Sequence, residues 1–384
     1  MGWEETCAVT ERVKFVLEVK RGERTVAECC RLAGVSRKTG YKWLGRYDEG
    51  GLQALEDRSR APHTHPNAVG LKVKAMLLEA RRQHPNWGAV TLLEWFGRRH
   101  PEVALPAAST VAELLKREGL VKPRVRSRRT PPYTRPFAHA GAPNAVWSAD
   151  FKGHFRTGDH LYCYPLTVSD GFSRYLLACR GLLHPTHEAA RPWFERLFRE
   201  YGLPLAIRTD NGVPFASRAL GGLSRLSAWW LRLGITPERI EPGRPQQNGR
   251  HERMHRTLKR GSCTPPRASL AAQQRAFDRF RTEYNEERPH HALGKATPAQ
   301  LYQASPRPYP SRLPELEYPS GFTVRRVRRG GDIKWQGKHI YVTNTLIGEP
   351  IGLYQVDEDL WSVYYGALEL GRLDARCARV EPKT

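Results

Sequence analysis

The sequence predicts a multidomain protein with all-α helix-turn-helix units at the N-terminus, an α/β domain in the centre and a small β-barrel at the C-terminus. Three observations lead to this fold class. Helical segments with capping residues fill the first third of the chain, strands followed by helices fill the middle, and short strands separated by Gly or Asp fill the end. The length of 384 residues allows about two to four domains. We place the segments at 1–60, 61–122, 123–143, 144–305 and 306–384.

The charge balance indicates the class of partner. Lys and Arg number 62 and Asp and Glu number 39, which gives a formal net charge of +23, and the 40% of hydrophobic residues excludes a disordered polycation. A globular chain this basic indicates a polyanionic partner, nucleic acid before an anionic membrane surface. The apolar stretches are too short for a membrane-spanning helix, and the acidic start does not resemble a signal peptide. Seven scattered cysteines without a C-x-x-C pair indicate reduced thiols, so we expect a cytoplasmic protein, associated with the nucleoid through DNA, without membrane contact.

Residues 11–47 are predicted to form a helix-turn-helix. Thr25 and Glu28 have the spacing of a capping box, Gly34 lies in the turn, and Ser36 is a second N-cap. A helical hairpin without a role in DNA binding is the alternative, but the basic second helix favours insertion into a DNA groove. The DNA-contacting residues expected on that helix are Arg37, Lys38, Thr39, Tyr41, Lys42 and Arg46.

A second helical unit and a basic arm are predicted to follow. Helices expected within 61–122 form either another DNA-binding unit or a spacer. The segment 123–143 is basic and rich in Pro, which suits an arm along DNA phosphates or a solvated linker better than a core. The phosphate contacts expected from this arm are Arg124, Arg126, Arg128 and Arg129.

The central and C-terminal segments are predicted from their β-branched and aromatic runs. The central elements that we expect are strands at 147–155, 161–168, 174–179 and 205–209 and helices at 188–201, 217–233, 247–260 and 270–286. The runs expected as strands of the C-terminal barrel are 322–324, 333–335, 339–342, 351–354 and 360–365.

Three carboxylates of the central domain stand out by their context. Asp150 lies inside an apolar strand, where an unpaired charge is costly. Asp210 follows a short buried strand, and ligands of open α/β sheets bind at the carboxyl ends of strands. Glu252 lies in the first turns of a helix that follows a break at Pro245 and Gly249. If these carboxylates converge, hard divalent cations would remove their repulsion, and Mg²⁺ or Mn²⁺, as two ions, suits such an oxygen site and the displacement of a phosphodiester.

Residues 145–260 resemble the integrase core of retroviral-type insertion-sequence transposases. The matching stretches are 147–153 (WSADFKG), 209–215 (TDNGVPF), 243–253 (GRPQQNGRHER) and 284–293 (YNEERPHHAL). The predicted N-terminal and C-terminal segments fit the same family, so the resemblance covers nearly the whole chain. One departure is the interval between Asp210 and Glu252, which is longer than in many members and falls in the expected helix at 217–233.

The resemblance implies a ribonuclease-H-like fold and a DNA-joining activity. Asp150, Asp210 and Glu252 would be the catalytic metal ligands of a transposase, which cleaves the ends of a mobile element and joins the 3′-hydroxyls to target DNA without ATP. Double-stranded DNA, as terminal repeats and as target, would be the partner, bound by a homo-oligomer. Near the site, we expect DNA contacts from Lys152, Arg250, His251, His255, Arg256 and Lys259.

Three alternatives compete with this interpretation. Asp170 is a further carboxylate, but its Asp-Gly context favours a turn. A regulator derived from a transposase would bind DNA without needing the triad. Residues 251–255 (HERMH) match the zinc-protease pattern, with Glu283 as a candidate third ligand, but the surrounding basic residues oppose a bound Zn²⁺.

Overall fold

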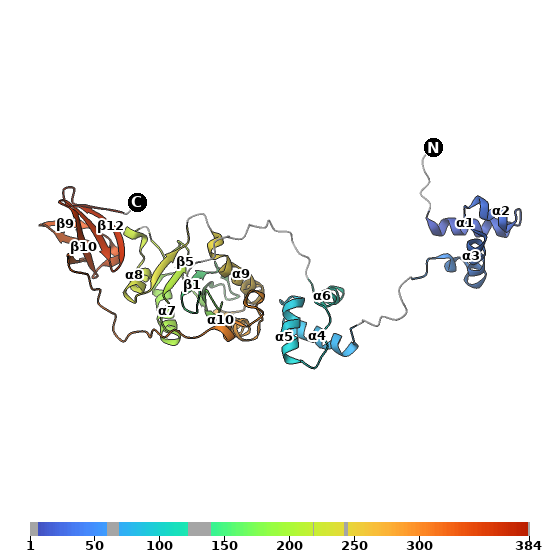
Figure 1. The fold of residues 1–384 in the computed structure, drawn as a ribbon, viewed down its shortest axis with the longest axis horizontal. Coiled ribbons are helices and arrows are strands. Elements are labelled where there is room, and N and C mark those ends of the chain that lie inside the picture. The colour runs from blue at the N-terminus through green and yellow to red at the C-terminus, as the bar shows by residue number, and fades with distance from the viewer. Residues whose placement is uncertain (1–6, 60–68, 122–139, 218, 242–244, 383–384) are drawn as a thin grey trace. The chain divides into compact units, whose positions relative to one another are not determined.

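The computed structural model describes residues 7–59, 69–121, 140–217, 219–241 and 245–382. The chain divides into two compact units, Met1–Val69 and Gly70–Thr384 (Figure 1). Among the described residues, no helix is long and apolar enough to span a membrane. The expected basic arm, including Arg124, Arg126, Arg128 and Arg129, lies outside the described residues.

The first unit is a three-helix domain that contains the predicted helix-turn-helix. Thr25 and Glu28 form the capping box of the second helix, and the Ser36 side chain accepts a hydrogen bond from the backbone of Thr39 at the start of the third. Gly40 permits close packing, because a Cβ at this position would collide with Cys30. The helices are α1 (Ala8–Arg21), α2 (Val26–Leu32), α3 (Arg37–Gly50) and the 3₁₀ helix η1 (Gly51–Leu55).

Three helices form the start of the second unit, close to the predicted positions. They pack around the buried Trp87, Leu92 and Phe96. Contacts to the central domain include a hydrogen bond from Arg98 to the carbonyl of Lys295 (2.7 Å) and an ion pair between Glu94 and Lys295 (2.6 Å). The helices are α4 (Leu71–Gln83), α5 (Ala89–Arg99) and α6 (Ala108–Arg117).

A mixed sheet forms the centre of the second unit. β1 pairs antiparallel with β3, which also pairs with β2 and β4, and β5 and β6 extend the sheet parallel to β1. Sequential antiparallel strands followed by parallel ones agree with the predicted ribonuclease-H-like arrangement. The strands are β1 (Val146–Phe151), β2 (Phe155–Arg156), β3 (Tyr162–Asp170), β4 (Leu176–Leu182), β5 (Ala206–Thr209) and β6 (Thr236–Arg239).

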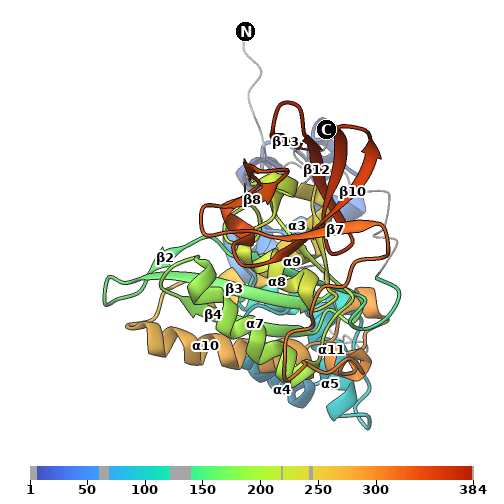
Figure 2. The same ribbon diagram turned by 90° about the vertical axis from the view of Figure 1, so that its left-hand side faces the viewer.

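Helices cover both faces of this sheet (Figure 2). Trp147, Leu166 and Val168 pack against α7 and α8, whereas Leu176 and Cys179 pack against α9 and α10. Because successive side chains of a strand point to opposite faces, Asp150 and its cross-strand partner Thr167 face α9. These helices are α7 (His187–Tyr201), α8 (Arg225–Arg232), α9 (Gly249–Leu258) and α10 (Leu270–Thr282).

The segment 284–293, which resembles the end of an integrase core, packs against β4. The Asn285 side chain donates to the carbonyl of Leu176 (3.0 Å) and accepts from its backbone N–H (2.8 Å), so it acts like an added strand residue on β4. The short helical elements around these helices are η2 (Leu220–Gly222), η3 (Pro245–Asn248), η4 (Lys259–Cys263), η5 (Glu283–Glu287), η6 (His291–Leu293) and α11 (Pro298–Leu301).

Two central elements differ from the prediction. The expected helix at 217–233 is confined to α8, because Gly221 and Gly222 adopt positive φ angles of 65° and 67° that interrupt a helix. The expected strands did not include β6, whose four residues Thr236–Arg239 are mostly polar and contain a proline. The segment is a strand because it pairs with β5. The pattern of polar and apolar residues within the segment does not indicate this pairing.

The C-terminal segment is rich in strands, but the predicted closed barrel is not confirmed. Five strands form an open antiparallel sheet in the order β13-β12-β11-β10-β7, and β8 and β9 form a separate hairpin. No pairing in the described residues closes these sheets into a barrel. The elements are β7 (Phe322–Arg326), β8 (Asp332–Trp335), β9 (Lys338–Tyr341), η7 (Asn344–Leu346), β10 (Pro350–Asp357), β11 (Leu360–Tyr365), β12 (Leu368–Asp374) and β13 (Arg379–Pro382).

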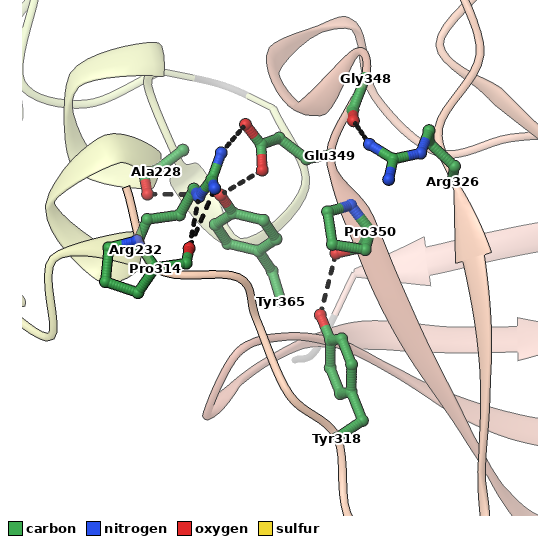
Figure 3. A network of polar contacts seen from close by, with 9 residues as sticks. All are labelled: Ala228, Arg232, Pro314, Tyr318, Arg326, Gly348, Glu349, Pro350 and Tyr365. Carbon is green, nitrogen blue, oxygen red and sulfur yellow. Dashed lines mark hydrogen bonds and ion pairs between the residues drawn. The ribbon is translucent and has the colours of Figure 1, made fainter. Parts of the chain in front are cut away.

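A polar cluster joins this C-terminal segment to α8 (Figure 3). Arg232 forms an ion pair with Glu349 (3.2 Å) and donates to the carbonyl of Pro314 (2.9 Å). The hydroxyl of Tyr365 donates to the other oxygen of Glu349 (3.2 Å). Leu223 belongs to the apolar core of the C-terminal segment. The chain between Asp210 and Glu252 therefore also provides a surface on which the C-terminal segment packs.

Candidate metal and catalytic site

The sheet brings the first two carboxylates to one edge. β1 and β5 are parallel neighbours in which Ser148 lies beside Arg208. Two residues further along each strand are Asp150 and Asp210, so both carboxylates lie at the carboxyl ends of adjacent parallel strands. Glu252 lies in the first turn of α9, as expected.

Asp150 is influenced by the charges of both other carboxylates of the predicted triad. Burial, followed by the negative charge of Asp210 and more weakly by that of Glu252, raises the pKa of Asp150 to about 7, against the opposing effects of the Phe151 backbone N–H and the Lys152 charge. The side chain of Asp150 is 20% exposed, so solvent and ions still reach it. Mutually repelling carboxylates at a partly open edge are a donor set that fits hard divalent cations.

The other two carboxylates are presented differently. Asp210 accepts a hydrogen bond from the backbone N–H of Gly212 (3.0 Å), which orients the side chain in the turn after β5. Glu252 is exposed on α9. Lys152 follows Asp150 closely and is half-buried, and its charge helps to lower the pKa of His255, so this cation also belongs to the site.

A buried polar cluster lies beneath Asp150. The side chains of His251 and His255 each place Nε2 2.7 Å from the hydroxyl of Thr167, and Nδ1 of His251 lies 3.0 Å from the hydroxyl of Ser169. Nδ1 of His255 lies 3.8 Å from a carboxylate oxygen of Asp150. Burial lowers the pKa of His251 to about 3, and burial together with the neighbouring charges lowers that of His255 to about 2, so both imidazoles are neutral near pH 7.

This placement of the two histidines differs from the expected one. His251 and His255 are 2% and 5% exposed and face the sheet, so they do not offer charge to DNA phosphates as predicted. The physical reason is that their i, i+4 spacing forms one stripe of α9, and this stripe is the buried one. Arg256 and Lys259 are exposed, whereas the exposed Arg250 also donates to the carbonyl of Gly171 (3.1 Å).

His251 and His255 lie close to the carboxylate of Asp150, and not to that of Glu283, the candidate third ligand of the zinc-protease pattern. One atom each of Asp150, His251 and His255 lie within 4.8 Å of one another, a grouping that could hold a metal ion. A carboxylate oxygen of Glu283, the candidate third zinc ligand, instead lies 3.4 Å from Nδ1 of His84, the residue that follows α4. The HERMH segment therefore packs beside Asp150, and Glu283 does not join it to form the zinc set of the protease alternative.

Asp170, the further carboxylate considered for the catalytic set, forms hydrogen bonds within a turn. Its side chain accepts hydrogen bonds from the backbone N–H groups of Asn144 and Ser173 (both 2.7 Å) and from the Ser173 hydroxyl (2.6 Å). Burial raises the pKa of Asp170, with these hydrogen bonds opposing the shift. These contacts agree with a structural role.

Sequence reasoning missed Thr167 and Ser169. Both are buried polar residues of β3, and they alternate with the apolar Leu166 and Val168. The alternation of polar and apolar residues in this strand is the signal that could have found them. When helices cover both faces of a sheet, the polar side chains of such a strand are buried, so the helix on that face must offer hydrogen-bond partners.

The predicted DNA-contacting face of the first unit is exposed. Arg37, Lys38 and Lys42 are exposed, and Tyr41 is 61% exposed. Thr39 is half-buried, with its hydroxyl 2.9 Å from that of Ser36, and the half-buried Arg46 lies over the ring of Trp43 at 4.7 Å.

Family models match these regions. Models described as an integrase core domain match residues 140–245 and 233–298. A model described as a helix-turn-helix domain matches residues 11–63, and one described as a homeodomain-like domain matches residues 39–115.

Solved structures give weaker likenesses. The HTLV-2 integrase catalytic core domain in complex with magnesium matches with 20% identity and a TM-score of 0.34, over 42% of this chain and 99% of that one. The simian T-cell lymphotropic virus intasome in complex with a PP2A regulatory subunit matches with 16% identity and a TM-score of 0.37, over 74% and 91%. TM-scores this low do not by themselves establish a shared fold.

Relatives in sequence are more informative. The insertion element IS407 31.7 kDa protein of Burkholderia multivorans is 31% identical over 61% of this chain and 87% of the relative. The insertion element IS476 39.2 kDa protein of Xanthomonas euvesicatoria is 28% identical over 71% and 70%. The Gag-Pol polyprotein of baboon endogenous virus is 32% identical over 40% of this chain and 9% of the polyprotein. With its helix-turn-helix and its integrase core, the chain belongs to the insertion-sequence transposases.

Proposed function

We propose that this chain binds the terminal repeats of a mobile element, cleaves the element's ends and joins the 3′-hydroxyls to target DNA by metal-dependent transesterification. The observation that carries the proposal is the placement of Asp150 and Asp210 at the carboxyl ends of the adjacent parallel strands β1 and β5, with Glu252 in the first turn of α9. The charges of Asp210 and Glu252 both raise the pKa of Asp150. A protein that only binds DNA gains nothing from two carboxylates at one edge of a sheet and a third on the neighbouring helix α9.

Asp150, Asp210 and Glu252 would hold Mg²⁺ or Mn²⁺, as two ions. Such ions activate the attacking oxygen and stabilise the leaving oxygen of an in-line displacement. Lys152 and the exposed cations Arg250, Arg256 and Lys259 would hold the phosphates beside the site. Because one phosphodiester replaces another, the reaction needs neither ATP nor a covalent enzyme intermediate.

The first unit supports recognition of the element. Its exposed α3 residues Arg37, Lys38, Tyr41 and Lys42 have the chemistry to contact base edges and phosphates in a groove. Joining requires two ends, so we propose that the protein acts as a homo-oligomer on DNA.

A strand-transfer assay with Asp210→Asn tests the proposal. The parent should join labelled terminal repeats to a plasmid in Mg²⁺, and the variant should not, while both bind the repeats equally. Asp278→Asn is the matched control, because Asp278 is exposed on α10 and contacts Gln274 rather than the site. An active Asp210→Asn variant would remove the catalytic assignment, and a parent that binds the repeats without joining them would indicate a regulator derived from a transposase.

A further inference from the structure

We infer that Thr167 is a positioning residue of the catalytic centre, whose hydroxyl ties the buried histidines of α9 to the strand of Asp150 and thereby fixes the spacing between Asp150 and Glu252. The inference rests on the proposed function, since it assigns a role in holding metal ions to a residue outside the triad. The three carboxylates could bind metal ions without this hydroxyl, so the role of Thr167 does not follow from the triad itself.

The sheet register places Thr167 where it can act. Thr167 lies directly opposite Asp150 in the antiparallel pair β1–β3, so both side chains occupy the face that α9 covers. The Thr167 hydroxyl donates to the backbone carbonyl of Asp150 (3.0 Å) and is fully buried. The hydroxyl therefore contacts the main chain of the first carboxylate residue directly.

The single proton of the Thr167 hydroxyl determines which atoms donate and which accept between Thr167 and the two imidazoles. A Thr hydroxyl has one proton and two acceptor positions. With the proton directed to Asp150, the two Nε2 atoms at 2.7 Å must both donate to Thr167. Nδ1 of His251 is then free to accept from the Ser169 hydroxyl (3.0 Å). The hydroxyls of Thr167 and Ser169 and both nitrogens of His251 thus find partners inside the core, as a buried polar network requires.

The consequence for Glu252 follows from helix geometry. His251 and His255 are separated by one turn and lie on the same stripe of α9, and Glu252 lies between them in sequence, one residue after His251. Two hydrogen bonds to one hydroxyl fix both the rotation of α9 and its height above the sheet. The apolar contacts of Met254 and Leu258 hold the helix on the sheet but specify its rotation less sharply.

Nδ1 of His255 faces the metal site. With Nε2 donating to Thr167, Nδ1 carries a lone pair and lies 3.8 Å from a carboxylate oxygen of Asp150, so these two acceptor atoms form no hydrogen bond and could both face a bound cation. Groups behind a metal ligand orient that ligand, and their loss commonly weakens metal affinity or activity by roughly 10- to 100-fold. Loss of the Thr167 hydroxyl should therefore weaken metal binding more than it slows the loaded enzyme.

The experiment compares Thr167→Val, which keeps the shape and removes the hydroxyl, with Thr167→Ser, which keeps the hydroxyl. Two quantities are measured on the full-length protein: Mn²⁺ affinity without DNA, by electron paramagnetic resonance, and the Mg²⁺ concentration that half-saturates strand transfer. We expect Thr167→Val to weaken both by roughly tenfold or more, with a smaller change in kcat at saturating Mg²⁺, and Thr167→Ser to restore both.

Thr157→Val is the matched control, because Thr157 is also buried but its hydroxyl bonds to Leu161 in the β2–β3 turn. It should lower the Tm without changing Mn²⁺ affinity. If Thr167→Val lowers only the Tm and leaves both metal measurements at parental values, or if Thr167→Ser does not restore them, the inference is wrong.

Two further outcomes keep the inference separate from the proposed function. A parent that binds Mn²⁺ but joins no DNA contradicts the proposed function, and the Mn²⁺ affinities still decide the role of Thr167. If Thr167→Val does not fold, Ser169→Ala decides, because it removes only the outer bond to His251. We expect it to weaken Mn²⁺ binding about two- to threefold, in keeping with the loss of one neutral hydrogen bond, and an unchanged affinity would overturn the inference.

Discussion

The helices α3 and α9 are both basic, yet they use their polar residues in opposite ways. α3 buries the small or apolar Gly40 and Leu44 and exposes three of its cations, Arg37, Lys38 and Lys42. α9 buries His251 and His255 together with two apolar residues, and it exposes Glu252 among arginines. The charge of a segment therefore does not reveal its role, because the role depends on which stripe faces the core.

The two helices need different precision in their placement. Long exposed cations can adjust to a DNA backbone, so α3 needs only an apolar stripe to keep it in place. A metal ligand tolerates little displacement, so the helix that carries Glu252 is held by directional hydrogen bonds. This contrast between α3 and α9 leads to predictions for DNA joining, DNA binding, metal binding and acid stability.

Removing the charge of Glu252 should have the largest effect. In Glu252→Gln, strand transfer should fall about a thousandfold, because loss of a metal ligand removes several kcal/mol of transition-state stabilisation, while binding to the terminal repeats is unchanged. Gel-based joining and binding assays measure both. Glu113→Gln on α6 is an exposed helical control. Normal joining by Glu252→Gln would show that α9 does not carry the third ligand.

Neutralising α3 should give the reverse pattern. The triple variant Arg37→Gln, Lys38→Gln, Lys42→Gln should bind the repeats far more weakly, and the slope of log K against log salt should decrease by about 0.9 for each phosphate that the variant no longer neutralises. Mn²⁺ binding at the core should not change. The control variant Lys14→Gln, Arg21→Gln, Arg24→Gln removes the same charge from the first unit outside α3. An equal weakening in both variants would mean that net charge, and not α3, determines binding.

Metal binding should depend on pH through Asp150. Because the pKa of this carboxyl is raised to about 7, a metal ion must displace a proton below that pH, and Mn²⁺ affinity should fall by up to about tenfold per pH unit from pH 7 to 5. Calorimetry at several pH values measures the dependence. A flat profile over this range would mean that Asp150 is ionised without metal, and the coupling to Asp210 would then be weaker than we infer.

The buried histidines should make the metal-free protein sensitive to acid. Their pKa values, about 3 and about 2, lie below the unfolded value near 6.5, so the unfolded chain binds more protons and stability falls as pH drops from about 6.5 to 4. Asp150 acts oppositely, since its raised pKa favours the folded state as pH falls from 7 to 4. Burial also raises the pKa of Asp170 and lowers that of His290 to about 4, so three histidines oppose two carboxyls. We therefore expect the Tm to decrease by several degrees.

The double variant His251→Gln, His255→Gln isolates the cause of this acid sensitivity. Glutamine retains hydrogen-bonding capacity but does not titrate, so the decrease in Tm on acidification should be much smaller in the variant than in the parent, because the contributions of His251 and His255 are gone. The same acid-induced decrease in parent and variant would assign it to other groups.

Local rules predicted several elements well. The capping box at Thr25 and the N-cap at Ser36 are present, because a cap depends only on residues within one helical turn. The positions of Asp150 within a strand, of Asp210 after a strand and of Glu252 in a first helical turn agree with the prediction for similar reasons. The family resemblance then supplied the order of these motifs.

The errors concern contacts between distant segments. β6 is a strand only because β5 lies beside it, and the open C-terminal sheet differs from a barrel only by the absence of a closing pair among the described strands. The exposed histidines that we expected are buried because β3 offers Thr167 and Ser169 as partners, more than eighty residues earlier in the chain.

Residue type and short-range spacing are enough to predict the helix-turn-helix, the alternation of strands and helices, the excess positive charge and the three carboxylates. The folded chain was needed to find which stripe of α9 is buried, that Thr167 lies opposite Asp150, and that two neutral imidazoles lie beside the carboxylate site. The physical reason is that burial and hydrogen-bond partners are properties of pairs of distant residues, and these two properties determine whether a basic motif contacts DNA or orients a metal ligand.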